Sequence, residues 1–284
     1  MIPTGSEKQA MDWSLALASQ GIACGIRVLH DPPGWAVEVD PHDAGPALRT
    51  LRIYHRENRR WRTGTGPTTG AFPFQWTVLV WCFLMMTLHM AAVAPGSRLE
   101  GAGLFDTKNF VAGDWWRPIT ATFLHSNLDH LVANLTSGFI VLGLAFGRYG
   151  VGPTLLVSLV AGSMANVLAW LLRSHDYLGL GASGVVMAGL GMIAVSLMTE
   201  AFEGRVSPAV ATRGLLGGIA LFLLLGTSPH SDVLAHAAGF VSGAILTVAL
   251  ARLPARLTRS PVADFACAAA FLLVSIIPWI FALG

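Results

Sequence analysis

Seven apolar stretches, most of them long enough to cross a lipid bilayer, constrain the fold of this chain more than any other feature. A transmembrane helix needs about 20 consecutive, mostly apolar residues. Of the 284 residues, 54% are hydrophobic and only 12% are charged, whereas soluble domains carry roughly 25% charged residues. The sequence therefore predicts an all-α polytopic membrane protein. The expected spans are residues 73–94, 128–147, 151–172, 183–199, 213–228, 232–251 and 262–283.

Positive charges are distributed unevenly between the two sides of such a bundle. Cytoplasmic loops of membrane proteins are enriched in Lys and Arg. If the N-terminus lies in the cytoplasm, fourteen of the eighteen Lys and Arg residues fall on that side. We therefore expect an integral, multi-pass membrane protein with its N-terminus in the cytoplasm. The net charge of +2 reflects this topology, and no feature indicates binding to nucleic acid.

Cysteine usage and the N-terminal composition exclude several other classes. The three cysteines show neither the spacing of a disulfide framework nor that of a metal site. The chain also lacks a His-Glu-x-x-His motif, so we expect no metal and no cofactor. Because the first 70 residues are polar and contain turns, no cleavable signal peptide is expected.

The residues before the first span are expected to form a small α+β cytosolic domain. A helical pattern over 7–20 precedes two strand patterns at 22–30 and 35–40, and Asp40 with Pro41 begins a second helix. This predicts an αββα unit over residues 1–62, followed by a flexible linker at 63–72. Regulation, dimerisation and simple tethering all remain open as its role.

The segment between the first two spans is unusually rich in aromatic residues. It covers residues 95–124 and contains Phe105, Phe110, Trp115 and Trp116. Aromatic residues on a loop are typical of an element that lies at the membrane interface. An ordinary loop outside the membrane is an equally good interpretation, and the sequence leaves both open.

Polar residues of three separate spans fall at one expected depth. With the N-terminus inside, the second, fourth and sixth spans begin near the non-cytoplasmic surface, where they carry His130 and Asn134, Ser183, and His236. Ionisable groups inside membranes usually face the bundle interior or a water-filled cavity. His236 alone could equally form a structural hydrogen bond between helices, but the coincidence of the whole set favours a functional site.

These residue types suit acyl transfer. A serine hydroxyl becomes a good nucleophile when a nearby base accepts its proton, and histidine is the usual base. Ser183 is therefore the candidate nucleophile and His236 the candidate base. Acyl transfer also needs donors for the developing oxyanion, which His130, Asn134 and the backbone N–H of Ser183 can supply. We also include Ala182 among the oxyanion- or substrate-stabilising residues.

Small residues provide a way for the spans to approach one another. Gly184, Ala188 and Gly191 form one stripe, and Gly239 and Gly243 lie on the His236 side of the sixth span. Such stripes let helix backbones come close, although they are common in all helical membrane proteins. We interpret Asp232, four residues before His236, as a helix N-cap and not as a third catalytic residue.

The residues quoted above, taken in order, resemble those of the rhomboid intramembrane serine proteases over residues 73–253. The matching motifs are Trp116-Arg117, His125 with His130-x-x-x-Asn134, Gly181-x-Ser183-Gly184, and Ala235-His236-x-x-Gly239. The resemblance implies a six-helix catalytic core with a Ser/His dyad that cleaves transmembrane protein substrates within the lipid bilayer. It also makes Gly181, Gly184, Gly239, His125, Trp116 and Arg117 supporting residues, and residues 254–284 an additional C-terminal transmembrane helix.

Two departures and two alternatives accompany this resemblance. Some relatives have an aromatic residue in place of Met187 and a Glu in place of Gly147, and the effect of both changes on activity is left open. A catalytically silent rhomboid-like protein that binds membrane helices for quality control is the main alternative. A small-solute transporter would show inverted repeats and charged midplane residues, and neither pattern is evident.

Overall fold

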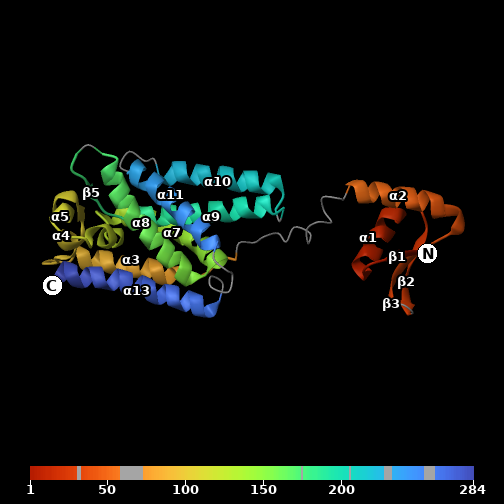
Figure 1. Cartoon of the computed structure of the whole chain (residues 1–284), viewed down its shortest axis with the longest axis horizontal. Helices are drawn as coiled ribbons and strands as arrows, with labels where there is room; N and C mark the ends of the chain where they lie inside the picture. The colour runs from red at the N-terminus through yellow and green to blue at the C-terminus, as the bar shows by residue number, and fades with distance from the viewer. Residues whose placement is uncertain (31–32, 58–72, 174, 205, 227–231, 253–259) are drawn as a thin grey trace. The chain divides into compact units, whose positions relative to one another are not determined.

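The computed structural model describes residues 1–30, 33–57, 73–173, 175–204, 206–226, 232–252 and 260–284. The chain forms two compact units, Met1–Thr68 and Thr69–Gly284 (Figure 1). The linker expected at 63–72 lies outside the described residues, as does part of the turn expected between the two predicted strands.

The N-terminal unit is a three-stranded antiparallel sheet packed with two helices. Its strand order is β1-β3-β2, so the sequence analysis missed one strand, β1, which pairs with β3. Asp40 caps a short 3-10 turn and not the helix itself, because its carboxylate accepts a hydrogen bond from the N–H of His42 at 2.9 Å. The elements are β1 (Ile2–Thr4), α1 (Glu7–Ala18), β2 (Cys24–His30), β3 (Pro33–Val39), η1 (Pro41–Asp43) and α2 (Ala44–Glu57).

The second unit is a bundle of long apolar helices. Five of the seven expected spans are confirmed as helices that are long and apolar enough to cross a membrane. The first expected span contains a shorter apolar helix, Val78–Ala92, and the fifth overlaps an apolar helix that begins at Pro208. The main helices of the bundle are α3 (Val78–Ala92), α7 (Leu128–Tyr149), α8 (Val151–Leu171), α9 (Ser183–Phe202), α10 (Pro208–Gly226), α11 (Val233–Ala251) and α13 (Pro261–Leu283).

The first expected span is shortened at its start because the chain there is attached to α7. The N–H of Gln75 donates to the carbonyl of Gly143 at 3.0 Å, and the ring of Phe74 occupies the place where a side chain at residue 143 would lie. The carbonyl of Pro73 similarly fills the place of a side chain at Gly147. The departure at Gly147 is therefore explained by a backbone segment that leaves no room for a larger residue.

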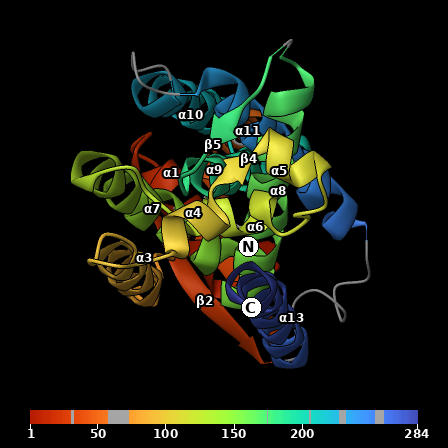
Figure 2. The same ribbon diagram turned by 90° about the vertical axis from the view of Figure 1, so that its left-hand side faces the viewer.

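Helix α9 lies at the centre of the bundle. Figure 2 shows it surrounded by α7, α8, α10 and α11, and it packs against all four. The closest approach is to α11, where a Cβ added at Gly239 would lie 2.5 Å from the carbonyl oxygen of Gly184. One turn further, a Cβ at Gly243 would collide with the backbone of Ala188. The small-residue contact expected from the sequence is confirmed.

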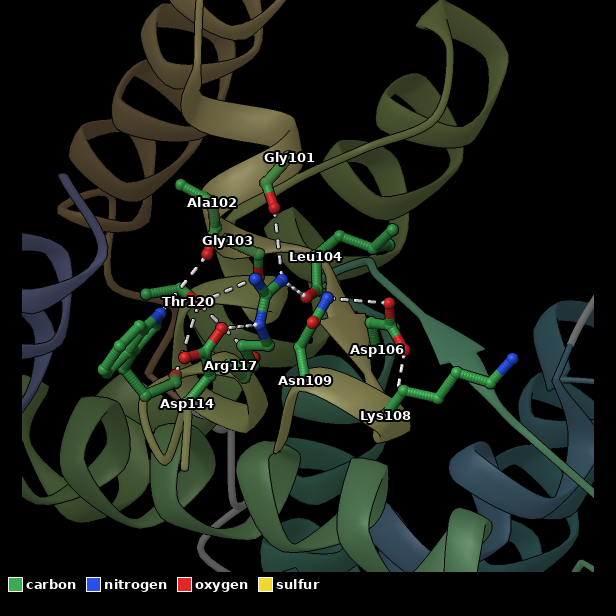
Figure 3. A network of polar contacts seen from close by, with 11 residues as sticks. Gly101, Ala102, Gly103, Leu104, Asp106, Lys108, Asn109, Asp114, Arg117 and Thr120 are labelled. Carbon is green, nitrogen blue, oxygen red and sulfur yellow. Dashed lines mark hydrogen bonds and ion pairs between the residues drawn. The ribbon is translucent and has the colours of Figure 1, made fainter. Parts of the chain in front are cut away.

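The 95–124 loop is ordered and folds around one buried arginine. The guanidinium of Arg117 is held by the Asp114 carboxylate at 2.7 Å and by the carbonyls of Gly101 and Leu104 at 3.1 and 2.8 Å (Figure 3). The buried guanidinium of Arg117 is therefore paired with a carboxylate and hydrogen-bonded to carbonyls of the same loop. Its elements are α4 (Leu99–Gly103), β4 (Phe105–Asp106), α5 (Thr107–Val111), α6 (Arg117–Thr120) and η2 (Ala121–Phe123).

A two-stranded ribbon joins this loop to the segment before α9. Strand β4 pairs antiparallel with β5 (Leu178–Gly179), so that Phe105 lies opposite Gly179. Residues 175–182, which lead into α9, contain no helix. The ribbon and a hydrogen bond from the N–H of Gly181 to the carbonyl of Ala121, at 2.9 Å, fix the approach to α9.

Candidate active site

A cavity of about 740 Å³ opens at the N-terminal ends of α7, α9 and α11. It brings together the four residues that the sequence analysis assigned to the chemistry, Ser183, His236, His130 and Asn134. These residues come from three helices and meet in one polar space. The remaining lining residues are Ser126, Asn127, Asp129, Ala133, Ser137, Tyr177, Leu178, Gly179, Leu180, Val186, Met187 and Asp232.

Ser183 is the first residue of α9 and is partly exposed to the cavity. The preceding Ala182 is buried. Gly181 has a φ of +128°, which side chains rarely adopt, and a Cβ there would lie 2.7 Å from Cε1 of His130 and 3.8 Å from Oγ of Ser183. Residue 181 must therefore be glycine for two reasons, and its position places the His130 ring beside the serine.

His236 lies in the first turn of α11 and is only 4% exposed. Gly239 follows it by three residues and contacts Gly184, the residue after Ser183. The close backbone contact between α9 and α11 therefore holds the serine and the histidine at one level of the bundle, on the wall of the same cavity. A larger residue at Gly239 would push the two helices apart, whereas a Cβ at Gly184 would instead face Ala165 and Gly162 of α8 at 3.3 and 3.4 Å.

Asp232 is the N-cap of α11, as expected. Its carboxylate accepts from the N–H of Ala235 at 2.9 Å and is bonded to the guanidinium of Arg173 at 2.6 Å. Burial raises the pKa of this carboxyl, but the hydrogen bonds from Ala235, Arg173 and Tyr177 outweigh it and leave the pKa below the ordinary value. The carboxylate therefore stabilises the start of the helix that carries His236.

The cluster of Asp232, Arg173 and Tyr177 is a feature that the sequence analysis missed. The Arg173 guanidinium lies 4.5 Å from the centre of the Tyr177 ring, and burial together with the Asp232 charge raises the pKa of the Tyr177 hydroxyl. The three residues come from the end of α8, the segment before β5 and the start of α11. No local sequence pattern could have signalled this association, because only the tertiary fold brings the residues together.

His130 and Asn134 occupy the first two turns of α7 on the cavity side. Asn127 caps this helix by accepting from the N–H of His130 at 2.8 Å. Nδ1 of His130 lies 3.2 Å from the Ser126 hydroxyl, while its Nε2 faces Gly181. The side-chain amide of Asn134 donates one hydrogen to the carbonyl of His130 at 3.0 Å. Nδ1 of His130 and one N–H of the Asn134 amide are therefore held by these contacts. Nε2 of His130 and the second N–H of Asn134 take no part in them.

None of the six supporting residues named in the sequence analysis is among the residues that line the cavity. Trp116 and Arg117 belong to the 95–124 loop, where the Trp116 indole donates to the carbonyl of Ala102 at 3.3 Å. His125 is buried behind His130, with their ring centres 5.3 Å apart. Burial, with smaller contributions from the His130 and His89 charges, lowers the pKa of His125 to about 3. It is therefore neutral at physiological pH.

His89 of α3 lies close to His125: it is 4% exposed, and its ring centre lies 6.4 Å from that of His125. Within the described part of the chain, its Nδ1 and both ring nitrogens of His125 have no hydrogen-bond partner. The spacing of single histidines in different spans gave no indication of this pair.

A second hollow, of about 240 Å³, lies between α9, α10 and α11. All of its described lining residues are apolar, among them Leu197, Gly214 and Phe222. Without a nucleophile or a proton acceptor, these lining residues offer no means of acyl transfer. The polar cavity around Ser183 is therefore the candidate active site.

Comparison with known proteins places this architecture in a family. The model of the Rhomboid domain matches residues 112–253, which is half of the chain. RHOMBOID-like protein 6, mitochondrial, of Arabidopsis thaliana is 34% identical over 152 residues, which cover 52% of this chain and 48% of that protein. The chain therefore spans about half the length of this relative.

Two bacterial relatives are named as proteases. The putative rhomboid protease YdcA of Bacillus subtilis (strain 168) is 26% identical over 170 residues, which cover 60% of this chain and 81% of that protein. Rhomboid protease AarA of Providencia stuartii is 26% identical over 182 residues, which cover 56% and 63% of the two chains. With the family match and a membrane-embedded helical bundle, the chain belongs to the rhomboid family of integral membrane proteins.

Proposed function

We propose that the protein is an intramembrane serine endopeptidase with Ser183 as nucleophile and His236 as general base. The observation that carries this proposal is the single cavity lined by both residues together with His130 and Asn134. The two bacterial relatives named as rhomboid proteases support the same reaction class. A passive helix bundle would not require a nucleophile, a base and oxyanion donors on one wall.

The reaction proceeds in two acyl-transfer steps. His236 accepts the proton of the Ser183 hydroxyl while Oγ attacks the carbonyl carbon of the scissile peptide bond. When the tetrahedral intermediate collapses, the C–N bond breaks and His236 donates this proton to the leaving amine. A water molecule then attacks the acyl-enzyme, again with His236 as base, and releases the new carboxylate and the free serine.

The oxyanion of each intermediate needs hydrogen-bond donors that are already in place. The Ser183 backbone N–H lies at the N-terminus of α9, where the helix dipole favours negative charge. The amide of Asn134 supplies a second donor. If the Ser126 hydroxyl donates to Nδ1 of His130, the ring proton resides on Nε2 and supplies a third. Each such donor is worth roughly 3–4 kcal/mol of transition-state stabilisation.

The substrate of this reaction would be a transmembrane segment of another protein. From the resemblance to the rhomboid proteases, we infer that a segment with a locally unstable helix and a small residue at the cleaved bond is favoured. The distribution of Lys and Arg supports a cytoplasmic N-terminus. We assign the protein to a bacterial inner membrane, with the cavity opening to the periplasmic side.

Labelling by a fluorophosphonate probe tests this proposal. The probe phosphonylates only a serine that an adjacent base has activated. We expect the full-length protein in detergent micelles to be labelled, and labelling to be lost in Ser183→Ala and in His236→Ala. A folded wild-type protein that ignores the probe would instead support the catalytically silent, helix-binding alternative.

A further inference from the structure

The C-terminal helix α13 contacts the structure behind the proposed nucleophile. Phe271 of α13 is only 8% exposed and belongs to the same buried cluster as Ala182, the residue before Ser183. Phe271 also lines a small internal space with Ala182 and Val185 of α9. An aromatic ring from the last helix therefore borders the same internal space as the residues on both sides of the serine.

The C-terminal end of α13 is attached to the 95–124 loop. A Cβ at Gly103 would lie 2.5 Å from Cη2 of Trp279, so the indole fits closely over this glycine. The Phe281 ring contacts the ring of Trp115, with centres 5.3 Å apart, and stacks on Trp116 at an interplanar angle of 19°. These contacts join the final turns of α13 to the loop by aromatic packing.

A hydrogen bond from a side chain to the backbone joins the same end of α13 to the loop. The guanidinium of Arg98, at the start of the loop, donates to the carbonyl of Leu283 at 2.8 Å. The last carbonyls of a helix lack partners within the helix, so a cation at this position satisfies one of them and complements the helix dipole. The two residues are 185 positions apart in the chain.

The other end of α13 is fixed to α8. The Asp264 carboxylate, in the first turn of α13, accepts from the N–H of Gly152 at the start of α8 at 3.0 Å. A Cβ at Gly152 would collide with the backbone of residue 264. Helix α13 is therefore held at its start, in its middle by Phe271 and at its end by the loop.

The loop in turn holds the segment that precedes Ser183. The Thr120 hydroxyl donates to the carbonyl of Gly103 at 2.8 Å (Figure 3), so the glycine under Trp279 is tied to α6. The next residue, Ala121, accepts the N–H of Gly181, and Phe105 pairs with Gly179. Displacement of the loop would therefore move the backbone immediately before the nucleophile.

We propose that α13 is a positioning element of the active site, with Phe271 and Trp279 as its two positioning residues. The inference rests on the proposed function of Ser183. Phe271 acts through the buried space that it lines with Ala182 and Val185, and Trp279 acts through the 95–124 loop and Gly181. Loss of either ring leaves a void that the surroundings fill by shifting, and a shift of about 1 Å at the reacting atoms can reduce a rate by roughly 100-fold.

The test uses the full-length protein with Phe271→Ala and Trp279→Ala. The matched controls are Phe265→Ala and Ile280→Ala, because these two side chains lie on the same helix and are 76% and 64% exposed. Fluorophosphonate labelling of Ser183 is measured as a function of probe concentration, which separates probe affinity from the maximal labelling rate. Thermal unfolding is measured in parallel, and all labelling is done well below the midpoint of the least stable variant.

We expect the maximal labelling rate to fall at least about tenfold in both test variants with little change in probe affinity, and to change by less than about twofold in the controls. Phe271→Leu, which retains most of the volume, should restore most of the rate and remains informative if Phe271→Ala does not fold. Test variants that unfold at lower temperature but label at the wild-type rate would overturn the inference.

Hydrogen exchange separates this inference from the proposed function. The amides of residues 178–186 should exchange faster in Phe271→Ala and Trp279→Ala than in the two controls, whether or not the protein reacts with the probe. If the wild type does not label, the proposed function fails while the exchange still reports on α13. Unchanged exchange in this segment, with normal wild-type labelling, would refute the positioning role alone.

Discussion

Helices α10 and α11 both flank α9, but they contact it in different ways. Helix α11 reaches the backbone of α9 through glycines, so that added methyl groups would collide with main-chain atoms. Helix α10 borders the apolar hollow of about 240 Å³ between it and α9. A Cβ at Gly214 would meet the flexible Leu197 side chain, at 2.8 Å, and a Cβ at Gly217 or Gly218 would meet no atom within 4 Å among the described residues. The closely packed helix α11 contains His236, whereas the loosely packed helix α10 contains no residue that we assign to the chemistry.

The difference shows where this fold requires geometric precision. Close-packed interiors respond to a single added methyl group, because backbone atoms cannot move aside as flexible side chains can. A surface that borders a hollow can absorb the same change. We therefore expect identical Gly→Ala substitutions to have opposite consequences on the two sides of α9.

The largest effect is expected for Gly239→Ala. The new Cβ would lie 2.5 Å from the carbonyl oxygen of Gly184, so α11 must move away from α9 and carry His236 with it. Overpacking of this kind costs about 1–3 kcal/mol, and we expect probe labelling of Ser183 to fall by roughly 100-fold. Thermal unfolding and labelling kinetics measure the two effects, and unchanged labelling would contradict the tight contact.

A somewhat smaller effect is expected for Gly181→Ala. The φ of +128° and the approach to the His130 ring both oppose a side chain at this position, with backbone strain of about 1–3 kcal/mol. Labelling should fall because the ring and the serine are displaced. Gly96→Ala is the matched control, since its φ is +79° and a Cβ there would meet no atom within 4 Å among the described residues. This control should lose stability but keep its labelling rate.

Asp232→Asn should have a modest effect. Asparagine can still cap Ala235, and the loss of the partly exposed ion pair with Arg173 should cost no more than roughly 1 kcal/mol, or about fivefold in labelling. A collapse of labelling in a folded protein would assign the carboxylate a direct role in catalysis.

The same variant changes the pH dependence of stability. The folded-state pKa of Asp232 lies below its ordinary value of 3.8, so its stabilisation is present above that value and is lost as the pH falls through the lower folded-state pKa. Thermal unfolding of the wild type should therefore show an additional loss of stability below about pH 4. Asp232→Asn should lack this component.

The smallest effect is expected for Gly218→Ala on α10. The methyl group enters open space, and alanine is the better helix former by about 1 kcal/mol. Labelling should remain within about twofold of the wild type and the unfolding temperature should stay constant or rise. A loss comparable to that of Gly239→Ala would show that α10 packs as tightly as α11.

The sequence was sufficient to predict the helical bundle and four of the residues that line the polar cavity. Apolar stretches of bilayer length identify spans without any knowledge of tertiary contacts, and single polar residues within them stand out because burial in lipid is costly. The polar positions at Ser183, His236, His130 and Asn134 were found in this way. Their meeting in one cavity required only the order of the helices and the small residues between α9 and α11.

Other features depend on contacts between distant residues and left no local pattern. Strand β1 has three residues and exists because it pairs with β3. The beginning of the first expected span is not helical because its backbone is bonded to α7. Two further features likewise follow from the tertiary fold, so periodicity and spacing could not reveal them. They are the packing of Trp279 against Gly103 and the cluster of Arg173, Tyr177 and Asp232.

The most direct test of the account is an experimental structure of the protein after reaction with a fluorophosphonate. The account predicts phosphorus bonded to Oγ of Ser183, the His236 ring within hydrogen-bond reach of that oxygen, and the phosphoryl oxygen directed at His130 and Asn134. An adduct on another residue, or a His236 ring separated from Ser183 by packed side chains or lipid, would contradict it.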